Sequence, residues 1–190
     1  MPGNRRRKKK PLQQIFCRIF TVYGPWKCIP GAFFVVKELC DFLTAFKQYL
    51  YQAHLSARGN AYAAHLLAEK LQNEVAEDID RLKELYIAFT GDLSIANAQE
   101  SLKQAELTLR AFLDPNNPED FKQILQRCVE LSVHCAEKAA NASMSLSEGT
   151  ANPGEVPYHM ALQNAVDDIC EHCVRYKYLL ETEVQHGNSN

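Results

Sequence analysis

The chain has 190 residues, of which 46% are hydrophobic and 23% are charged, a composition typical of one soluble globular domain with a buried core. No apolar run approaches the roughly 18 residues of a transmembrane helix, so an integral membrane protein is not expected. The seven cysteines are odd in number and loosely spaced, which indicates a reducing compartment rather than a small disulfide-rich scaffold.

The net charge of −2 hides an uneven distribution of charge along the chain. Residues 1–37 carry nine basic side chains and no acidic one, whereas the rest of the chain holds 12 basic and 23 acidic side chains. We therefore expect a basic, partly flexible N-terminal arm over residues 1–32, a helical domain over 33–185 and a polar tail over 186–190.

After the arm, apolar residues recur at helical spacings of three and four. This periodicity predicts one short and four long helices, over about 34–57, 61–89, 96–112, 118–147 and 156–184. Gly91 is expected to end the second helix, and Asn117 to cap the third long one with Pro118 at its first position. About 28 residues separate the second and third long helices, too many for a tight turn. The fold class expected is all-α, a ferritin-like four-helix bundle with a short helix in that long connection.

The second helix carries four side chains that suit a metal ion, His65, Glu69, Asp80 and Glu84. On a helical wheel they share one face of about 100°, beside and not within the apolar stripe of their own helix. The two pairs of ligands are nevertheless about 22 Å apart along the helix, so one chain cannot close a single site with them.

A two-fold axis would solve this problem of distance. If two copies of the helix pack antiparallel about an axis near residues 74 and 75, the first pair of one chain faces the second pair of the other. Two equivalent sites result, and His54 at the end of the first helix is placed to add a second imidazole to each.

The same residues carry a resemblance to a known family. His54 and Gly59, then His65-x3-Glu69, then Asp80-x3-Glu84 resemble the ferroxidase signature of Dps proteins, the DNA-binding proteins from starved cells. The chain differs in having Leu55 after the first histidine instead of tryptophan, and in a histidine spacing one residue shorter than is common. It also has Glu69 for the usual aspartate and Leu85 for an arginine found in many members.

The resemblance implies an iron-storage cage that works as a ferroxidase. It implies a homo-oligomer, a hollow dodecamer, whose two-iron sites lie at dimer interfaces with His54, His65 and Glu69 from one subunit and Asp80 and Glu84 from its neighbour. It further implies oxidation of Fe(II), preferably by hydrogen peroxide, which would protect DNA from oxidative damage. Imidazole and carboxylate ligands with open coordination positions suit this chemistry.

The arm begins with six consecutive cations, Arg5, Arg6, Arg7, Lys8, Lys9 and Lys10. Such a block binds the DNA backbone without sequence preference, and twelve arms on one particle would act together. A nuclear localisation signal, an organelle transit segment and a solubilising tail remain open as alternatives. We expect a cytoplasmic protein that associates with no membrane and is open to nucleoid association, or an organelle protein if the arm is a transit segment.

Two other functions remain open at this point. One is a non-enzymatic helical assembly that binds DNA or a partner through the arm, with a degraded iron site. The other is a thiol-based metal-binding bundle that uses Cys128, Cys135, Cys170 and Cys173. Because free cysteine is among the most buried residue types, we expect these thiols to pack in the core.

Overall fold

The structure, a computed structural model, describes residues 30–57, 61–112, 120–148, 154 and 156–186. These residues form the helices α2 (Pro30–Ser56), α3 (Tyr62–Thr90), η2 (Leu93–Ala96), α4 (Ala98–Phe112), α5 (Phe121–Ser147) and α6 (Val156–His186). They contain no strand, so the predicted all-α class is confirmed. Within these ranges, no helix is both long and apolar enough to cross a membrane.

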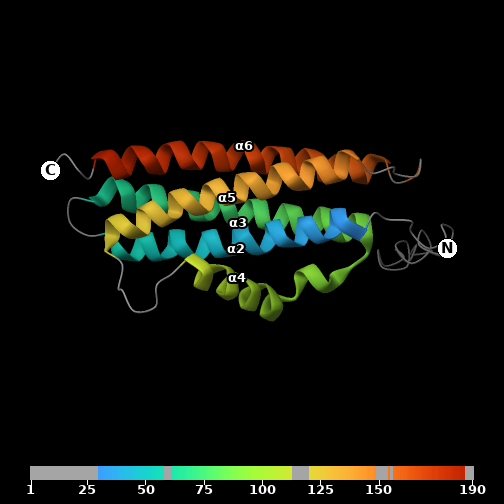
Figure 1. Ribbon diagram of the computed structural model, residues 1–190, viewed down its shortest axis with the longest axis horizontal. Coiled ribbons are helices and arrows are strands. Elements are labelled where there is room, and N and C mark those ends of the chain that lie inside the picture. The colour runs from blue at the N-terminus through green and yellow to red at the C-terminus, as the bar shows by residue number, and fades with distance from the viewer. Residues whose placement is uncertain (1–29, 58–60, 113–119, 149–153, 155, 187–190) are drawn as a thin grey trace, which may run out of the picture.

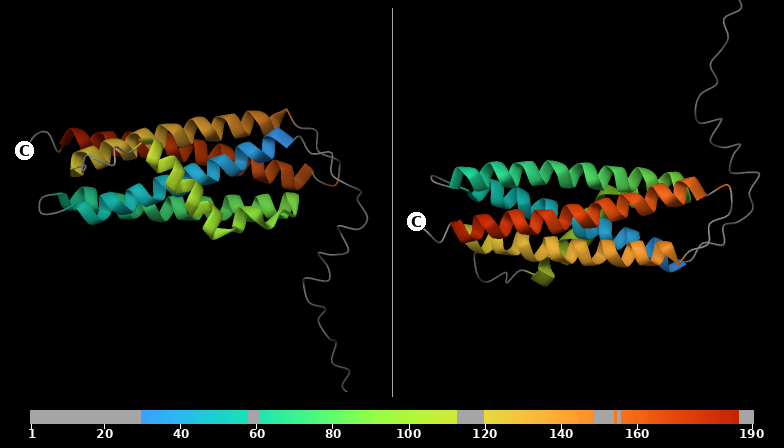
Figure 2. Two further views of the ribbon diagram at one scale, coloured as in Figure 1. Left: turned by 60° about the horizontal axis from the view of Figure 1, so that its bottom comes forward. Right: turned by 90° about the horizontal axis from the view of Figure 1, so that it is seen from above.

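The four long helices lie side by side as an elongated bundle, with α4 on its outside (Figure 1). α2 packs against α3 and α5, and α6 packs against the same two helices from the opposite corner. α3 and α5 run in the same direction, so the chain must return along the whole bundle between them (Figures 1 and 2). η2 and α4 lie on this return path, and α4 packs against α2. The predicted short helix in the long connection is therefore confirmed.

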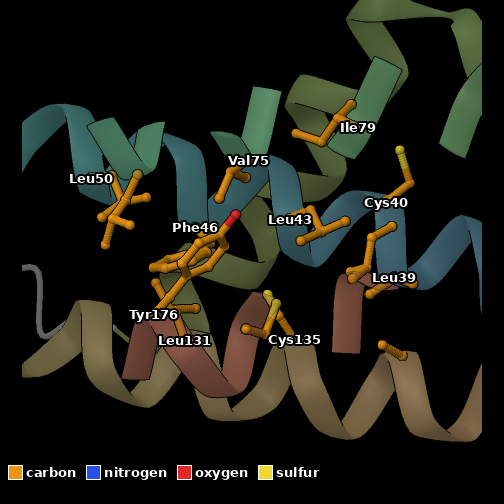
Figure 3. Packing of buried hydrophobic residues seen from close by; sticks show 14 of the residues in the cluster. Leu39, Cys40, Leu43, Phe46, Leu50, Val75, Ile79, Leu131, Cys135 and Tyr176 are labelled. Atoms are coloured by element: carbon orange, nitrogen blue, oxygen red, sulfur yellow. The ribbon is translucent and has the colours of Figure 1, made fainter. Parts of the chain in front are cut away.

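The core lies along the axis of the bundle and is almost wholly apolar. Every member of the predicted α3 stripe is buried, namely Leu71, Val75, Ile79, Leu82, Tyr86 and Phe89. Near the middle, Phe46 of α2 lies beside Tyr176 of α6, with ring centroids 6.2 Å apart. Figure 3 shows these two rings between Val75 on one side and Leu131 and Cys135 on the other. The core cluster that contains Phe46 thus draws side chains from all four long helices.

Two helix starts differ from the sequence prediction. α2 begins at Pro30, before the predicted arm ends at residue 32, because proline at a helix start loses no hydrogen bond. α5 has Asp120 as its N-cap, not the predicted Asn117. The Asp120 carboxylate accepts from the backbone N–H of Gln123, and the Gln123 side chain accepts from the backbone N–H of Asp120. This capping box satisfies two backbone donors at once.

Gly91 ends α3 as predicted. Its backbone has φ 70°, in the left-handed region, and its N–H donates to the carbonyl of Ile87 at 2.8 Å. Next to it, the Asp92 carboxylate accepts from Lys37 at 2.7 Å, which ties the end of α3 to the start of α2. This hydrogen bond from Lys37 lowers the pKa of Asp92 well below its usual value.

We expect Gly91→Ala to lower the free energy of unfolding by about 1 kcal/mol, because the added Cβ is disfavoured at positive φ. Urea unfolding followed by circular dichroism measures the change. Gly91→Asn is the control, since asparagine tolerates this conformation and should cost less. Equal losses for both variants would contradict the explanation.

Candidate metal centre

The hairpin of α2 and α3 brings the two predicted histidine ligands together. His54 lies in the last turn of α2 and His65 in the first turn of α3, and their ring centroids are 4.0 Å apart at an angle of 26°. Glu69 follows His65 by four residues and so shares its face of α3. His54, His65 and Glu69 each offer one ligand atom within 4.8 Å of the others.

This spacing is close to what a single metal ion requires. With bonds of about 2.0–2.2 Å, two ligand atoms on opposite sides of one ion lie at most about 4.4 Å apart. The ligand atoms here are no more than 4.8 Å apart, so side-chain movements of at most a few tenths of an ångström would close the set. Two imidazoles and a carboxylate are also the ligand types that hold Fe(II) in proteins.

Hydrogen bonding leaves one nitrogen of His65 available to a metal ion. The Nδ1 of His65 lies 3.0 Å from the backbone carbonyl oxygen of His54. A carbonyl only accepts, so Nδ1 is the donor and, in the neutral ring, Nε2 keeps its lone pair. A hydrogen bond of this kind also fixes the ring, as partners of metal-bound histidines commonly do.

The ring of His54 has an unsatisfied polar atom. Its Nδ1 is buried and has no hydrogen-bond partner in the described part of the chain. A buried polar atom without a partner costs about 1–3 kcal/mol. The chain therefore carries a destabilising histidine beside a second histidine and a carboxylate, which is typical of residues retained for a function.

We expect His54→Phe to raise the free energy of unfolding of the metal-free protein by about 1 kcal/mol, because phenylalanine keeps the ring and removes the unpaired nitrogen. The carbonyl that holds His65 is unaffected. Thermal unfolding in the presence of a chelator measures the change. A stability loss would instead indicate that His54 has a structural role.

Two tyrosines flank the histidines and were not predicted as neighbours of the site. The ring of Tyr51 stacks on His54 with centroids 6.4 Å apart, and that of Tyr62 stacks on His65 with centroids 6.1 Å apart. Each tyrosine precedes its histidine by three residues, a spacing that places both on one helix face. That spacing was the available signal.

The remaining predicted ligands are placed elsewhere on α3. Asp80 and Glu84 are exposed, and they are not part of the cluster formed by His54, His65 and Glu69. Because α3 is one unbroken helix, no bend brings its two pairs together. One chain thus supplies a three-residue cluster and, separately, an acidic pair. The predicted DNA-binding cations at positions 5–10 lie outside the described residues.

The cysteines fit the core-packing prediction. Cys128, Cys135 and Cys173 are buried, and Cys170 is half-buried. A soft-metal site needs thiolates, but the neighbouring Cys135 thiol and burial raise the pKa of Cys173 well above its usual value. No cysteine among the described residues belongs to a cluster with metal-binding spacing. These findings weigh against the thiol-based alternative.

A buried acid on α3 was missed by the sequence reasoning. Asp78 is 5% exposed, accepts from Nδ1 of His172 at 3.1 Å, and accepts from the Tyr176 hydroxyl at 3.4 Å. Burial nevertheless raises the pKa of Asp78, so these partners do not fully offset its desolvation. On either side, Glu74 pairs with Arg175 and Arg81 pairs with Asp168 of α6. The sequence signal was a charge at helical spacing from Val75 and Leu82.

The fold and the cluster together define an all-α bundle in which three side chains that could hold a metal ion gather at the end of α2 and the start of α3. No protein family, curated protein or solved structure matches the chain in sequence or fold comparison.

Proposed function

We propose that this chain is the subunit of an iron-storage cage that oxidises Fe(II) with hydrogen peroxide at sites shared between two copies. The observation that carries the proposal is the cluster of His54, His65 and Glu69, with ligand atoms within 4.8 Å of one another. The unpaired Nδ1 of His54 and the free Nε2 of His65 add to it, since both are suited to receive a metal ion.

The need for a second copy follows from the geometry of α3. Centres of the pairs His65/Glu69 and Asp80/Glu84 are about 22 Å apart along one straight helix. Antiparallel packing of two α3 helices about an axis near residues 74 and 75 would set each pair opposite its complement. Tyr62 and Leu66 are exposed beside the cluster. Large apolar side chains favour burial, which supports the proposal that a second copy covers this face of α3.

Fe(II) is the substrate in this proposal. Two Fe(II) ions each give one electron to a molecule of hydrogen peroxide, whose O–O bond breaks as two protons are taken up and two waters are released. Delivering both electrons at one site avoids the hydroxyl radical that a single electron would produce. The role of the chain is to hold the two ions with imidazole nitrogens and carboxylate oxygens. The ferric product would be stored inside a dodecamer.

The cations Arg5, Arg6, Arg7, Lys8, Lys9 and Lys10 complete the proposal. A run of this kind binds DNA through phosphate contacts that weaken with salt, and would hold the cage on the DNA it protects. A cytoplasmic, nucleoid-associated location fits this role.

Anaerobic addition of Fe(II) to the purified chain, followed by peroxide, tests the activity. We expect ferric absorbance to rise much faster than in buffer, from a particle of about twelve chains by size-exclusion light scattering. Asp80→Ala/Glu84→Ala should abolish the rapid phase. Asp167→Ala/Glu171→Ala is the matched control, because it removes an exposed acidic pair of the same spacing from α6 and should leave oxidation unchanged.

Oxidation no faster than in buffer would overturn the proposal. An assembled but inactive particle would leave the non-enzymatic helical assembly as the better account. Equal losses in the α3 and α6 variants would show that surface acidity in general, and not the proposed site, attracts the iron.

A further inference from the structure

A groove lies between α2 and α4, and residues of η2 also contribute to its lining. It has a volume of about 480 Å³ and an apolar wall that includes Phe34, Phe42 and Ile95. Phe34, in the first turns of α2, lines the groove and is 69% exposed. An apolar recess with such an exposed aromatic side chain favours an occupant with apolar groups of its own.

The polar part of the groove is acidic. Glu38, Asp41 and Glu100 contribute to its lining, and Glu38 already pairs with Lys138 of α5. Its one basic member, Lys37, pairs with Asp92, so Asp41 and Glu100 are the acidic side chains that face the groove without a cationic partner among the described residues. Asp41 has no hydrogen bond or ion pair with any described residue. Burial raises the pKa of Asp41 to about 6, and the nearby Glu100 and Glu38 add to the effect, whereas Lys83 of α3 and Lys37 lower it. A carboxylate in this position would be stabilised by an additional cation.

The segment that precedes α2 has the complementary chemistry. Residues 1–29 hold eight basic side chains and no acidic one, and the part nearest α2 carries Phe20, Tyr23, Trp26 and Lys27. Trp26 is four residues from the start of α2, so it can reach about 14 Å from there in an extended chain. The groove wall begins at Phe34, within the first turns of the same helix. Length, charge and aromatic content thus match.

We propose that residues 16–29 of the arm dock in the α2–α4 groove of the same chain, with an aromatic ring against its apolar wall and a basic side chain near Asp41 and Glu100. Docking would leave the cation block at positions 5–10 free at a fixed place on the bundle. Docking in the acidic groove would occupy part of the basic arm. Without docking, all the basic side chains of the arm would be available to DNA. The inference does not depend on iron oxidation.

Trp26 makes a direct test practical, because it is the only tryptophan of the chain. In the folded 190-residue chain we expect the emission of Trp26 to be blue-shifted, and its acrylamide quenching to be several-fold weaker, relative to the unfolded chain. Emission and quenching equal to those of the unfolded chain would overturn the proposal.

Two groove variants identify the docking place. Glu100→Lys reverses a charge on exposed α4, and Phe34→Ser removes part of the apolar wall, so neither should disturb the core. Each is expected to raise the quenching of Trp26 several-fold, whereas the control Glu106→Lys, also on α4 but outside the groove, should not. A buried Trp26 that responds to neither groove variant would mean that the arm binds elsewhere, against the proposal.

A mixture distinguishes the arm of the same chain from that of another copy. One partner carries Trp26→Phe with an intact groove, and the other carries Trp26 with Glu100→Lys. If each arm docks on its own chain, acrylamide quenches Trp26 as strongly in the mixture as in the Glu100→Lys variant alone. Restored protection in the mixture would show docking between copies and would overturn the proposal.

Discussion

Mixing two inactive variants is expected to restore about a quarter of wild-type Fe(II) oxidation if the sites lie on two-fold axes. One variant carries His54→Ala/His65→Ala, and the other carries Asp80→Ala/Glu84→Ala. Each alone should lose at least about a hundredfold in rate, since even the partners of metal ligands cost up to that much. After co-refolding, half of the dimers are mixed, and each of these has one intact site and one that lacks both halves.

The control for this experiment is a chain that carries all four substitutions, co-refolded with either variant. No dimer in that mixture has an intact site, so no activity should return. A wild-type rate for either variant alone would show that one half suffices. Inactivity of the complementary mixture, with dimers present, would rule out the antiparallel arrangement of α3.

The largest effect on stability is expected for Phe46→Ala. Phe46 is fully buried in the core that the four long helices share, and its ring lies beside that of Tyr176 (Figure 3). Removing a buried phenylalanine ring costs about 3–5 kcal/mol, because apolar contacts are lost and a cavity remains. This is a large share of the stability of an ordinary domain.

Urea unfolding of the metal-free protein measures the loss. Tyr178→Ala provides the control, since Tyr178 is 70% exposed on α6 and should change the free energy of unfolding by less than about 0.5 kcal/mol. A loss below about 1 kcal/mol for Phe46→Ala would mean that the bundle repacks around the missing ring and that its centre is loosely specified.

The parts of the fold that could be predicted from sequence are those set by local periodicity. α3 was predicted over 61–89 and spans Tyr62–Thr90, because its apolar stripe is regular and Gly91 is a strong stop. The proximity of His54, His65 and Glu69 was also accessible, since a short connection forces the ends of α2 and α3 together.

What sequence could not give depends on which helices become neighbours. The partners of Asp78, which are His172 and Tyr176, come from α6, nearly a hundred residues away, and periodicity within α3 does not name them. The start of α5 was misplaced for a different reason. Asn117 and Asp120 are both residue types that favour the N-cap position. Asp120 takes that position with the help of Gln123, whose side chain accepts a hydrogen bond from the backbone N–H of Asp120.

Because α3 is an unbroken helix, it fixes both the distance and the relative direction of Glu69 and Asp80. Eleven residues separate them, which is close to three full turns, so both project from nearly the same side. One inserted residue between them would rotate the acidic pair by about 100° and separate it from any partner surface that the cluster contacts. Seven inserted residues would preserve the side but lengthen the span by about 10 Å. Natural variants of this chain should therefore tolerate length changes in their loops and reject them within this helix.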